Sequence, residues 1–300
     1  MPPKPLAKHL QQVIDEYEGG FKGCSYSAAA ARSLQATVEA NGQTFDGHEA
    51  CLSNGLIPQS MLALPFMAAE KLFPGCFPGG AQGRGSCVAW STRNAAWGSY
   101  CADLLYGENE DRGSAPELSP VAIDNGCVST EAIYWYRGKD SDGWFCDAAV
   151  EVALNKAGLV LRKNYPELGF DLTEYSARTE GKWGRIPPPP NVRDATDNNL
   201  VKNATKVNTW EDVCAMLVNG YCLTTCGSEA FSKRRNAYGI CNRTNGTWYH
   251  AMAVTGLDSR QETIEREGCG LLLVQNSWGN YVSGADIIWG TNLRIPTGSF

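Results

Sequence analysis

The sequence has little concentrated positive charge. Its 300 residues carry 26 Lys and Arg against 32 Asp and Glu, a formal net charge of -6, without a dense basic run. Binding to a phosphate backbone or to anionic lipid depends on a basic patch or stripe. We therefore expect neither nucleic acid nor a membrane surface as a partner.

Long apolar runs are absent as well. No stretch reaches the ~18 consecutive apolar residues that a membrane-spanning helix needs. The chain opens with Met1, Pro2 and Pro3 and continues into a polar segment at residues 8–18, which is unlike the apolar core of a secretory signal. We expect a cytoplasmic protein, with incorporation into a larger particle as an alternative. The 43% apolar content allows one large domain or two lobes that share a cleft.

Cysteine, by contrast, is abundant, with twelve in the chain. Such a number indicates disulfides in an exported protein and buried thiols in a reducing compartment, and we expect mostly reduced thiols. His48 lies close to Cys51, but no Cys-x-x-Cys or paired histidine spacing accompanies it. Cys222 and Cys226, with Cys241, also suggest a metal cluster, yet the first pair falls in a predicted strand and is interpreted as core thiols. No metal and no cofactor is expected.

Periodicity predicts helices before Gly220 and short strands after it. The predicted helices cover residues 5–17, 59–73, 87–106, 147–156 and 209–218, and the predicted strands cover residues 221–225, 251–257 and 271–274. Asp147 is predicted to cap the fourth helix, and Thr209 with Asp212 the fifth. The proline run at residues 187–190 is interpreted as an extended crossover.

Two cleft-forming lobes fit this pattern. We expect an α+β fold with a helical N-terminal lobe, an antiparallel β-rich C-terminal lobe and the active-site cleft between them. The predicted division is an N-terminal extension at residues 1–75, a helical lobe at residues 76–185 and a β-rich lobe at residues 186–300.

Cys87 and His250 are the candidates for chemistry. Cys87 begins a predicted helix, and the partial positive charge of a helix N-terminus favours the thiolate, which is the nucleophilic form. Of three histidines, only His250 lies in the β-rich part, at the start of a predicted strand. A base there could accept the thiol proton and later donate it to a leaving amine. The alternative interpretations are an inert buried cysteine and a core histidine.

At this point the sequence resembles a known family. Residues 82–91, Gln-Gly-Arg-Gly-Ser-Cys-Val-Ala-Trp-Ser, are similar to the active-site segment of papain and the cathepsins. His250 with the apolar residues after it resembles the histidine segment of these peptidases, and residues 275–279, Gln-Asn-Ser-Trp-Gly, match their Asn-Ser-Trp-Gly signature. The resemblance covers roughly residues 80–290 and implies a two-lobed papain-like fold.

The resemblance also implies a role for each matching residue. Cys87 would be the nucleophile, His250 the acid and base, and Asn276 the group that orients the imidazole, with Trp278 covering that hydrogen bond. Gln82, together with the Cys87 backbone N–H, would form the oxyanion hole.

The same family places a substrate groove at residues 143–145. Gly143 would pair with an extended peptide, and Trp144 with Phe145 would line an apolar side-chain pocket. The implied partner is a peptide or protein substrate with a bulky apolar residue near the cut. Arg84 stands where the family has a disulfide-forming cysteine, so that cross-link is absent, and Val88 replaces an aromatic residue.

Other functions remain open at the level of the sequence. One alternative is a cell-wall amidase or transpeptidase with a Cys-His-polar site, and another is a non-catalytic assembly protein that retains the peptidase fold. Residues 1–75 lie where the family carries a pro-segment, and we expect them to pack near the cleft as an inhibitory segment or to dock an assembly partner.

Overall fold

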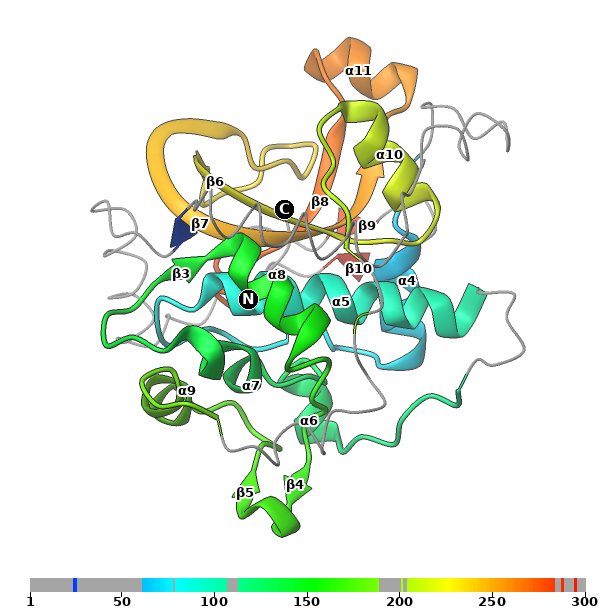
Figure 1. Cartoon of the computed structure of the whole chain (residues 1–300). Helices are drawn as coiled ribbons and strands as arrows, with labels where there is room; N and C mark the ends of the chain where they lie inside the picture. Colours follow the sequence, from blue (N-terminus) through cyan, green and yellow to red (C-terminus); the bar gives the residue numbers. More distant parts are fainter. Residues whose placement is uncertain are drawn as a thin grey trace.

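The structure is a computed structural model that describes residues 24–25, 61–77, 79–106, 113–188, 201, 204–283, 287–288 and 294–295. It is an α+β protein in which a group of helices and an antiparallel sheet pack against each other, with helix α5 (Cys87–Tyr106) running between them (Figure 1). The helix predicted at residues 5–17 lies outside the described residues.

The main sheet is built around one long strand, β7 (Arg243–Asp258). Antiparallel to β7 run β6 (Leu223–Phe231), β8 (Leu271–Gln275) and the short β2 (Met61–Leu62). The predicted strands at residues 221–225, 251–257 and 271–274 are confirmed as parts of β6, β7 and β8. The second half of β7 is buried on both faces because α5 packs against it as well as the neighbouring strands.

The remaining elements are short. The other helices are α4 (Leu64–Leu72), α6 (Pro120–Asp124), α7 (Thr130–Tyr134), α8 (Cys146–Asn155), α9 (Ala177–Trp183), α10 (Trp210–Val218) and α11 (Gln261–Glu267), with 3-10 turns η1 (Trp135–Arg137) and η2 (Pro166–Leu168). The minor strands are β1 (Cys24–Ser25), β3 (Trp144–Phe145), β4 (Asn164–Tyr165), β5 (Phe170–Asp171), β9 (Ile287–Ile288) and β10 (Arg294–Ile295).

Helix α5 has the bounds that the sequence predicts, residues 87–106. It is buried on almost every side in its first half, where Trp90 and Trp97 are fully enclosed. A helix enclosed in this way belongs in the middle of a protein and not on its surface. Ser91 of α5 hydrogen-bonds to Thr224 of β6, which fixes the helix against the sheet.

The predicted caps have different outcomes. At α10 the Thr209 side chain accepts from the Asp212 backbone N–H at 3.1 Å, and the Asp212 carboxylate accepts from the Thr209 backbone N–H. The predicted capping box is therefore confirmed. At α8 the prediction is wrong, because the N-cap is Phe145 and Asp147 lies in the first turn. A carboxylate in that turn still complements the helix dipole.

Within the described part of residues 61–283, eight cysteines are thiols and two form a disulfide. Cys146 and Cys226 form a disulfide, so the interpretation of Cys226 as a core thiol is wrong; its residue is exposed on β6. The disulfide joins the first residue of α8 to the sheet, across the boundary between the helices and the strands. The other cysteines in the described part of residues 61–283 are thiols: Cys76, Cys87, Cys101, Cys127, Cys214, Cys222, Cys241 and Cys269.

The last part of the predicted N-terminal extension is built into the core. β2 pairs with the end of β7, and α4 packs on α5 with Phe66 and Phe73 buried. These residues therefore contribute to the fold itself. Within the described ranges, no helix is long and apolar enough to cross a membrane, and no group of three or more His, Cys, Asp or Glu side chains has the arrangement of a metal site.

Candidate active site

Cys87 is the first residue of α5, where the partial charge of the helix favours an anion. Its side chain is fully buried. It belongs to one apolar cluster with Ala251, which follows His250 on β7, and with Trp278. The predicted position at a helix N-terminus is therefore confirmed, and the cluster joins the start of α5 to the sheet.

His250 lies on β7, paired with Gly227 of β6, and is 2% exposed. Its ring Nε2 is 2.9 Å from Asn276 Oδ1, and this oxygen also accepts from the Ser277 backbone N–H at 2.7 Å. Because a carboxamide oxygen can only accept, Nε2 carries the proton of the neutral ring and Nδ1 carries its basic lone pair. The imidazole is therefore held in one tautomer and one orientation.

Trp278 lies against the imidazole that makes this hydrogen bond. Its indole stacks on the His250 ring, with centroids 4.4 Å apart and planes inclined by 25°. Trp248 and Tyr281 pack against Trp278 at centroid distances of 5.0 and 4.7 Å. Exclusion of water strengthens a buried hydrogen bond, so the aromatic cluster stabilises the orientation of the imidazole.

Gln82 is hydrogen-bonded to Ser277, the residue that follows Asn276. Its backbone N–H donates to the Ser277 carbonyl at 2.7 Å, and its side-chain oxygen accepts from the Ser277 hydroxyl. The amide nitrogen donates to the Arg84 carbonyl at 2.7 Å. Ala81 and Trp278 form an antiparallel bridge next to these contacts.

The described contacts connect three segments that are distant in the sequence. Gln82 and Cys87 come from the start of α5 and the loop before it, His250 from β7, and Asn276 and Trp278 from the residues after β8. The Gln82–Ser277 contacts, the His250–Asn276 bond and the packing of α5 on β7 bring all of these elements to one region. Ser277 is the contact that the sequence prediction missed, although it lies inside the Asn-Ser-Trp-Gly motif.

The predicted groove residues lie directly beside the loop at residues 82–86, which precedes Cys87. The Gly143 N–H donates to the Gly85 carbonyl at 3.1 Å, and Gly143 has φ of 83°, a conformation that favours glycine. Trp144 is 5% exposed and packs in the same cluster as Cys87, while Phe145 is half-buried. Trp144 and Phe145 form β3, which pairs in parallel with Cys24 and Ser25 of β1 (Figure 1).

Comparison with known proteins gives structural similarity only. No known family profile and no curated protein matches the chain. One similar solved structure is xylellain, a cysteine protease from Xylella fastidiosa, at 19% identity over 66% of this chain and 70% of that one, with a TM-score of 0.43. A procathepsin B from Trypanosoma congolense is similar at 16% identity over 98% of this chain and 91% of that one, with a TM-score of 0.39.

Xylellain is named as a cysteine protease, and the second protein as a procathepsin B. Neither TM-score reaches 0.5, so the function proposed below depends on the residues of the site.

Proposed function

We propose that the protein is a cysteine peptidase of the papain type, with Cys87 as nucleophile and His250 as acid and base. The observation that supports this most directly is the buried His250–Asn276 hydrogen bond at 2.9 Å, with Trp278 stacked on the ring. A histidine that serves only packing does not need a carboxamide partner, a covering indole and a helix N-terminal cysteine in one cluster.

The proposed reaction uses Cys87, His250 and Gln82. The Cys87 thiolate attacks the peptide carbonyl, and the resulting oxyanion accepts hydrogen bonds from the Cys87 backbone N–H and the second N–H of the Gln82 carboxamide. His250 donates its proton to the leaving amine, which departs and leaves a thioester. His250 then takes a proton from water, the hydroxide attacks the thioester, and the acid product and the thiolate are released.

The substrate is an extended peptide that binds at Gly143 and β3. The pairing of β3 with β1 supports this proposal, because it demonstrates that the β3 edge accepts a second extended segment. Phe145 and Trp144 would contact an apolar side chain near the cut. Specificity for a bulky apolar residue is the part of the proposal that depends on the motif resemblance and not on a contact.

The N-terminal part of the chain is proposed to inhibit the enzyme. β1 contacts β6 and β7 as well as β3, so residues 24–25 lie between the β3 edge and the strand that carries His250. An extended peptide at the same edge would have to displace them. Inhibition is assigned to the segment around β1, because β2 and α4 belong to the core.

The activated thiolate is tested by alkylation with iodoacetamide at pH 6. Burial raises the pKa of Cys241 to about 11 and that of Cys222 to about 12, so these thiols remain protonated and unreactive. Cys269 is exposed, so a Cys269→Ser background removes its contribution. We expect Cys87 to be alkylated first, as located by mass spectrometry, and Cys87→Ala to abolish this fast phase.

Equal alkylation of Cys87 and Cys241 at pH 6 would contradict the proposal. Cleavage of a peptide library by the wild type, and not by Cys87→Ala, would identify the activity as proteolysis. Release of peptidoglycan fragments without peptide cleavage would instead indicate an amidase. An unimpaired biological role of Cys87→Ala would indicate an assembly protein.

A further inference from the structure

A buried carboxyl group contacts the loop at residues 82–86, which precedes Cys87. Glu180, on helix α9, is fully buried. An ionisable side chain is rarely enclosed unless specific partners hold it. One of those partners, Ser86, lies in the loop between Gln82 and Cys87, and another, Tyr175, contacts the same loop at Gly83.

Glu180 is connected to this loop at two places, directly at Ser86 and through Tyr175 at Gly83. The Ser86 hydroxyl donates to Glu180 Oε2 at 2.8 Å, and Ser86 immediately precedes Cys87. The Tyr175 hydroxyl also donates to Oε2, at 2.7 Å, and accepts from the Gly83 backbone N–H at 3.0 Å. One carboxylate oxygen therefore connects the residue before the nucleophile with the residue after Gln82.

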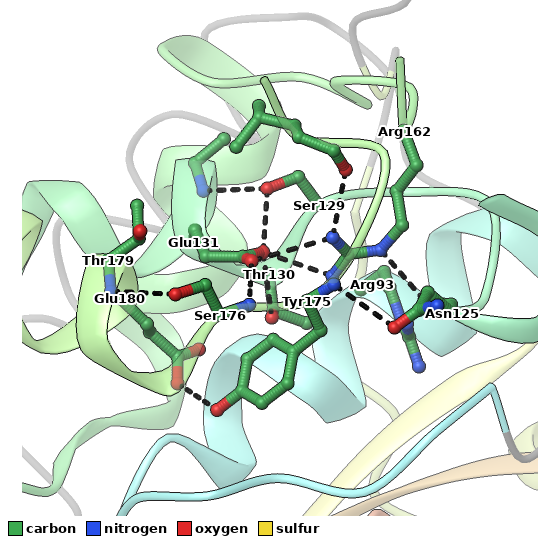
Figure 2. A network of polar contacts seen from close by, with 12 residues as sticks. Arg93, Asn125, Ser129, Thr130, Glu131, Arg162, Tyr175, Ser176, Thr179 and Glu180 are labelled. Carbon is green, nitrogen blue, oxygen red and sulfur yellow. Dashed lines mark hydrogen bonds and ion pairs between the residues drawn. The ribbon is translucent and has the colours of Figure 1, made fainter. Parts of the chain in front are cut away.

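The Tyr175 side of this connection is fixed by a buried polar network (Figure 2). The Tyr175 N–H donates to Asn125 Oδ1 at 3.0 Å, and its ring lies edge-on against Trp90 of α5 at 5.1 Å. The neighbouring Ser176 N–H donates to Glu131 Oε1 at 2.8 Å. A hydroxyl anchored on both sides has little freedom to move with the loop.

A buried ion pair anchors the network in turn. Arg162 Nη2 is 3.0 Å from Glu131 Oε2, and both side chains are fully buried. Arg162 also donates to the carbonyls of Asn125, at 2.8 Å, and Leu172, at 3.1 Å. Removing one partner of such a pair leaves a buried charge uncompensated, so the network that holds Tyr175 and Ser176 depends on both Arg162 and Glu131.

We propose that Glu180 is a positioning residue for the nucleophile: its carboxyl group holds Ser86 directly and Gly83 through Tyr175, and so fixes the loop that presents Cys87 and Gln82. The inference rests on the proposed function, because it assigns the purpose of the contact to the geometry of that reaction. A displacement of about 1 Å between reacting groups can reduce a rate by roughly 100-fold.

The acceptor oxygen, and not the charge, is the property required. Burial and repulsion by Glu131 raise the pKa of Glu180 to about 7, while the bonds from Tyr175 and Ser86 oppose the rise. The other ionisable groups that face it are Arg84, Tyr134 and Tyr175. Glutamine keeps an acceptor oxygen of the same reach and should therefore replace glutamate.

The test compares Glu180→Ala, Glu180→Gln and Tyr175→Phe in the full chain, each in the Cys269→Ser background. The matched control is Glu174→Ala, which removes an exposed carboxylate from the same region. The rate constant for alkylation of Cys87 by iodoacetamide at pH 6 is measured, together with the melting temperature. This readout does not require that the peptide substrate be known.

We expect iodoacetamide to alkylate Cys87 roughly 10- to 100-fold more slowly in Glu180→Ala than in the control. In Glu180→Gln the rate should return to within about 3-fold of the control. Tyr175→Phe should slow it as well, because it disconnects Gly83. With a cleavable peptide, the loss should fall on kcat while KM stays unchanged.

The inference would be overturned if iodoacetamide alkylated Cys87 at the control rate in folded Glu180→Ala and Tyr175→Phe proteins. It would also be overturned if alkylation of Cys87 were as slow in Glu180→Gln as in Glu180→Ala. If Glu180→Ala does not fold, Tyr175→Phe and Glu180→Gln decide the question. A wild-type Cys87 that reacts no faster than Cys241 contradicts the proposed function instead, so the two failures are distinguishable.

Discussion

At the scale of single residues, the site depends on groups that fix other groups. Asn276 sets the orientation of the His250 ring, and Ser277 holds both the backbone and the side chain of Gln82. Glu180 is proposed to do the same for Ser86 and Gly83. The His250–Asn276, Ser277–Gln82 and Ser86–Glu180 side-chain contacts are buried, so the loss of any of them leaves an unsatisfied polar group and a displaced partner.

The raised pKa of Glu180 predicts a pH dependence of stability. Between its unfolded value near 4.5 and the folded value of about 7, the unfolded chain releases this proton while the folded protein retains it. Stability therefore falls as the pH rises through this window, by about 3 kcal/mol, and the contribution is constant above it.

Urea unfolding of the wild type and of Glu180→Gln at pH 4.5, 6 and 8 tests this prediction. The difference between the two proteins should grow in favour of Glu180→Gln with rising pH, because the amide does not titrate. A difference that is constant across the three pH values would show that Glu180 ionises normally in the folded protein.

At the scale of elements, α5 and β7 form the centre of the molecule. α5 begins with Cys87, the proposed nucleophile, and β7 carries His250 where its buried half begins. The Cys146–Cys226 disulfide supplies a second connection between the helices and the sheet. Cys146 directly follows β3, and Cys226 pairs with Ala251, the neighbour of His250, so the bond lies beside the proposed groove.

Removal of this disulfide is predicted to destabilise the protein. It closes a loop between residues 80 positions apart, for which the chain-entropy relation gives about 4.5 kcal/mol. The double variant Cys146→Ser/Cys226→Ser should lose about this free energy of unfolding, measured with urea. Cys269→Ser, at an exposed thiol, is the control and should be unchanged.

A reducing agent provides the complementary measurement. Dithiothreitol should lower the unfolding midpoint of the wild type and leave that of the double variant where it is. An equal decrease in both proteins would place the sensitive bond elsewhere.

At the scale of the whole molecule, the first 75 residues do not act as one unit. β2 pairs with the end of β7 and α4 buries apolar side chains in the core, whereas β1 lies at the edge of β3 and contacts β7, the strand that carries His250. The fold therefore includes the later part of this region, and the proposed inhibitory contact involves the earlier part.

Removal of residues 1–55 is predicted to activate the protein. If β1 leaves the β3 edge open for no more than about a tenth of the time, its removal should accelerate alkylation of Cys87 by at least about tenfold. Removal of residues 1–75 should instead lower the melting temperature, because Phe66 and Phe73 leave the core. Equal alkylation rates for the full chain and the chain without residues 1–55 would exclude inhibition by β1.

Much of the protein follows from the sequence alone. Residues 87–106 predict α5 because they contain no proline and repeat apolar side chains at helical spacing, and Thr209 with Asp212 predicts the start of α10. The four proposed catalytic positions lie in motifs that are each continuous in the sequence, so they are recognisable without a structure. Local patterns of this kind are determined by neighbouring residues.

Only the tertiary structure determined the contacts between distant segments. Cys226 looked like a core thiol because its pairing depends on where β6 lies relative to α8, and the place of β2 in the sheet depends on the far end of β7. Glu180 has no motif, and its contact with Ser86 joins residues 94 positions apart. Burial, pairing and proximity are properties of the folded chain, since they depend on which surfaces meet when the core is packed.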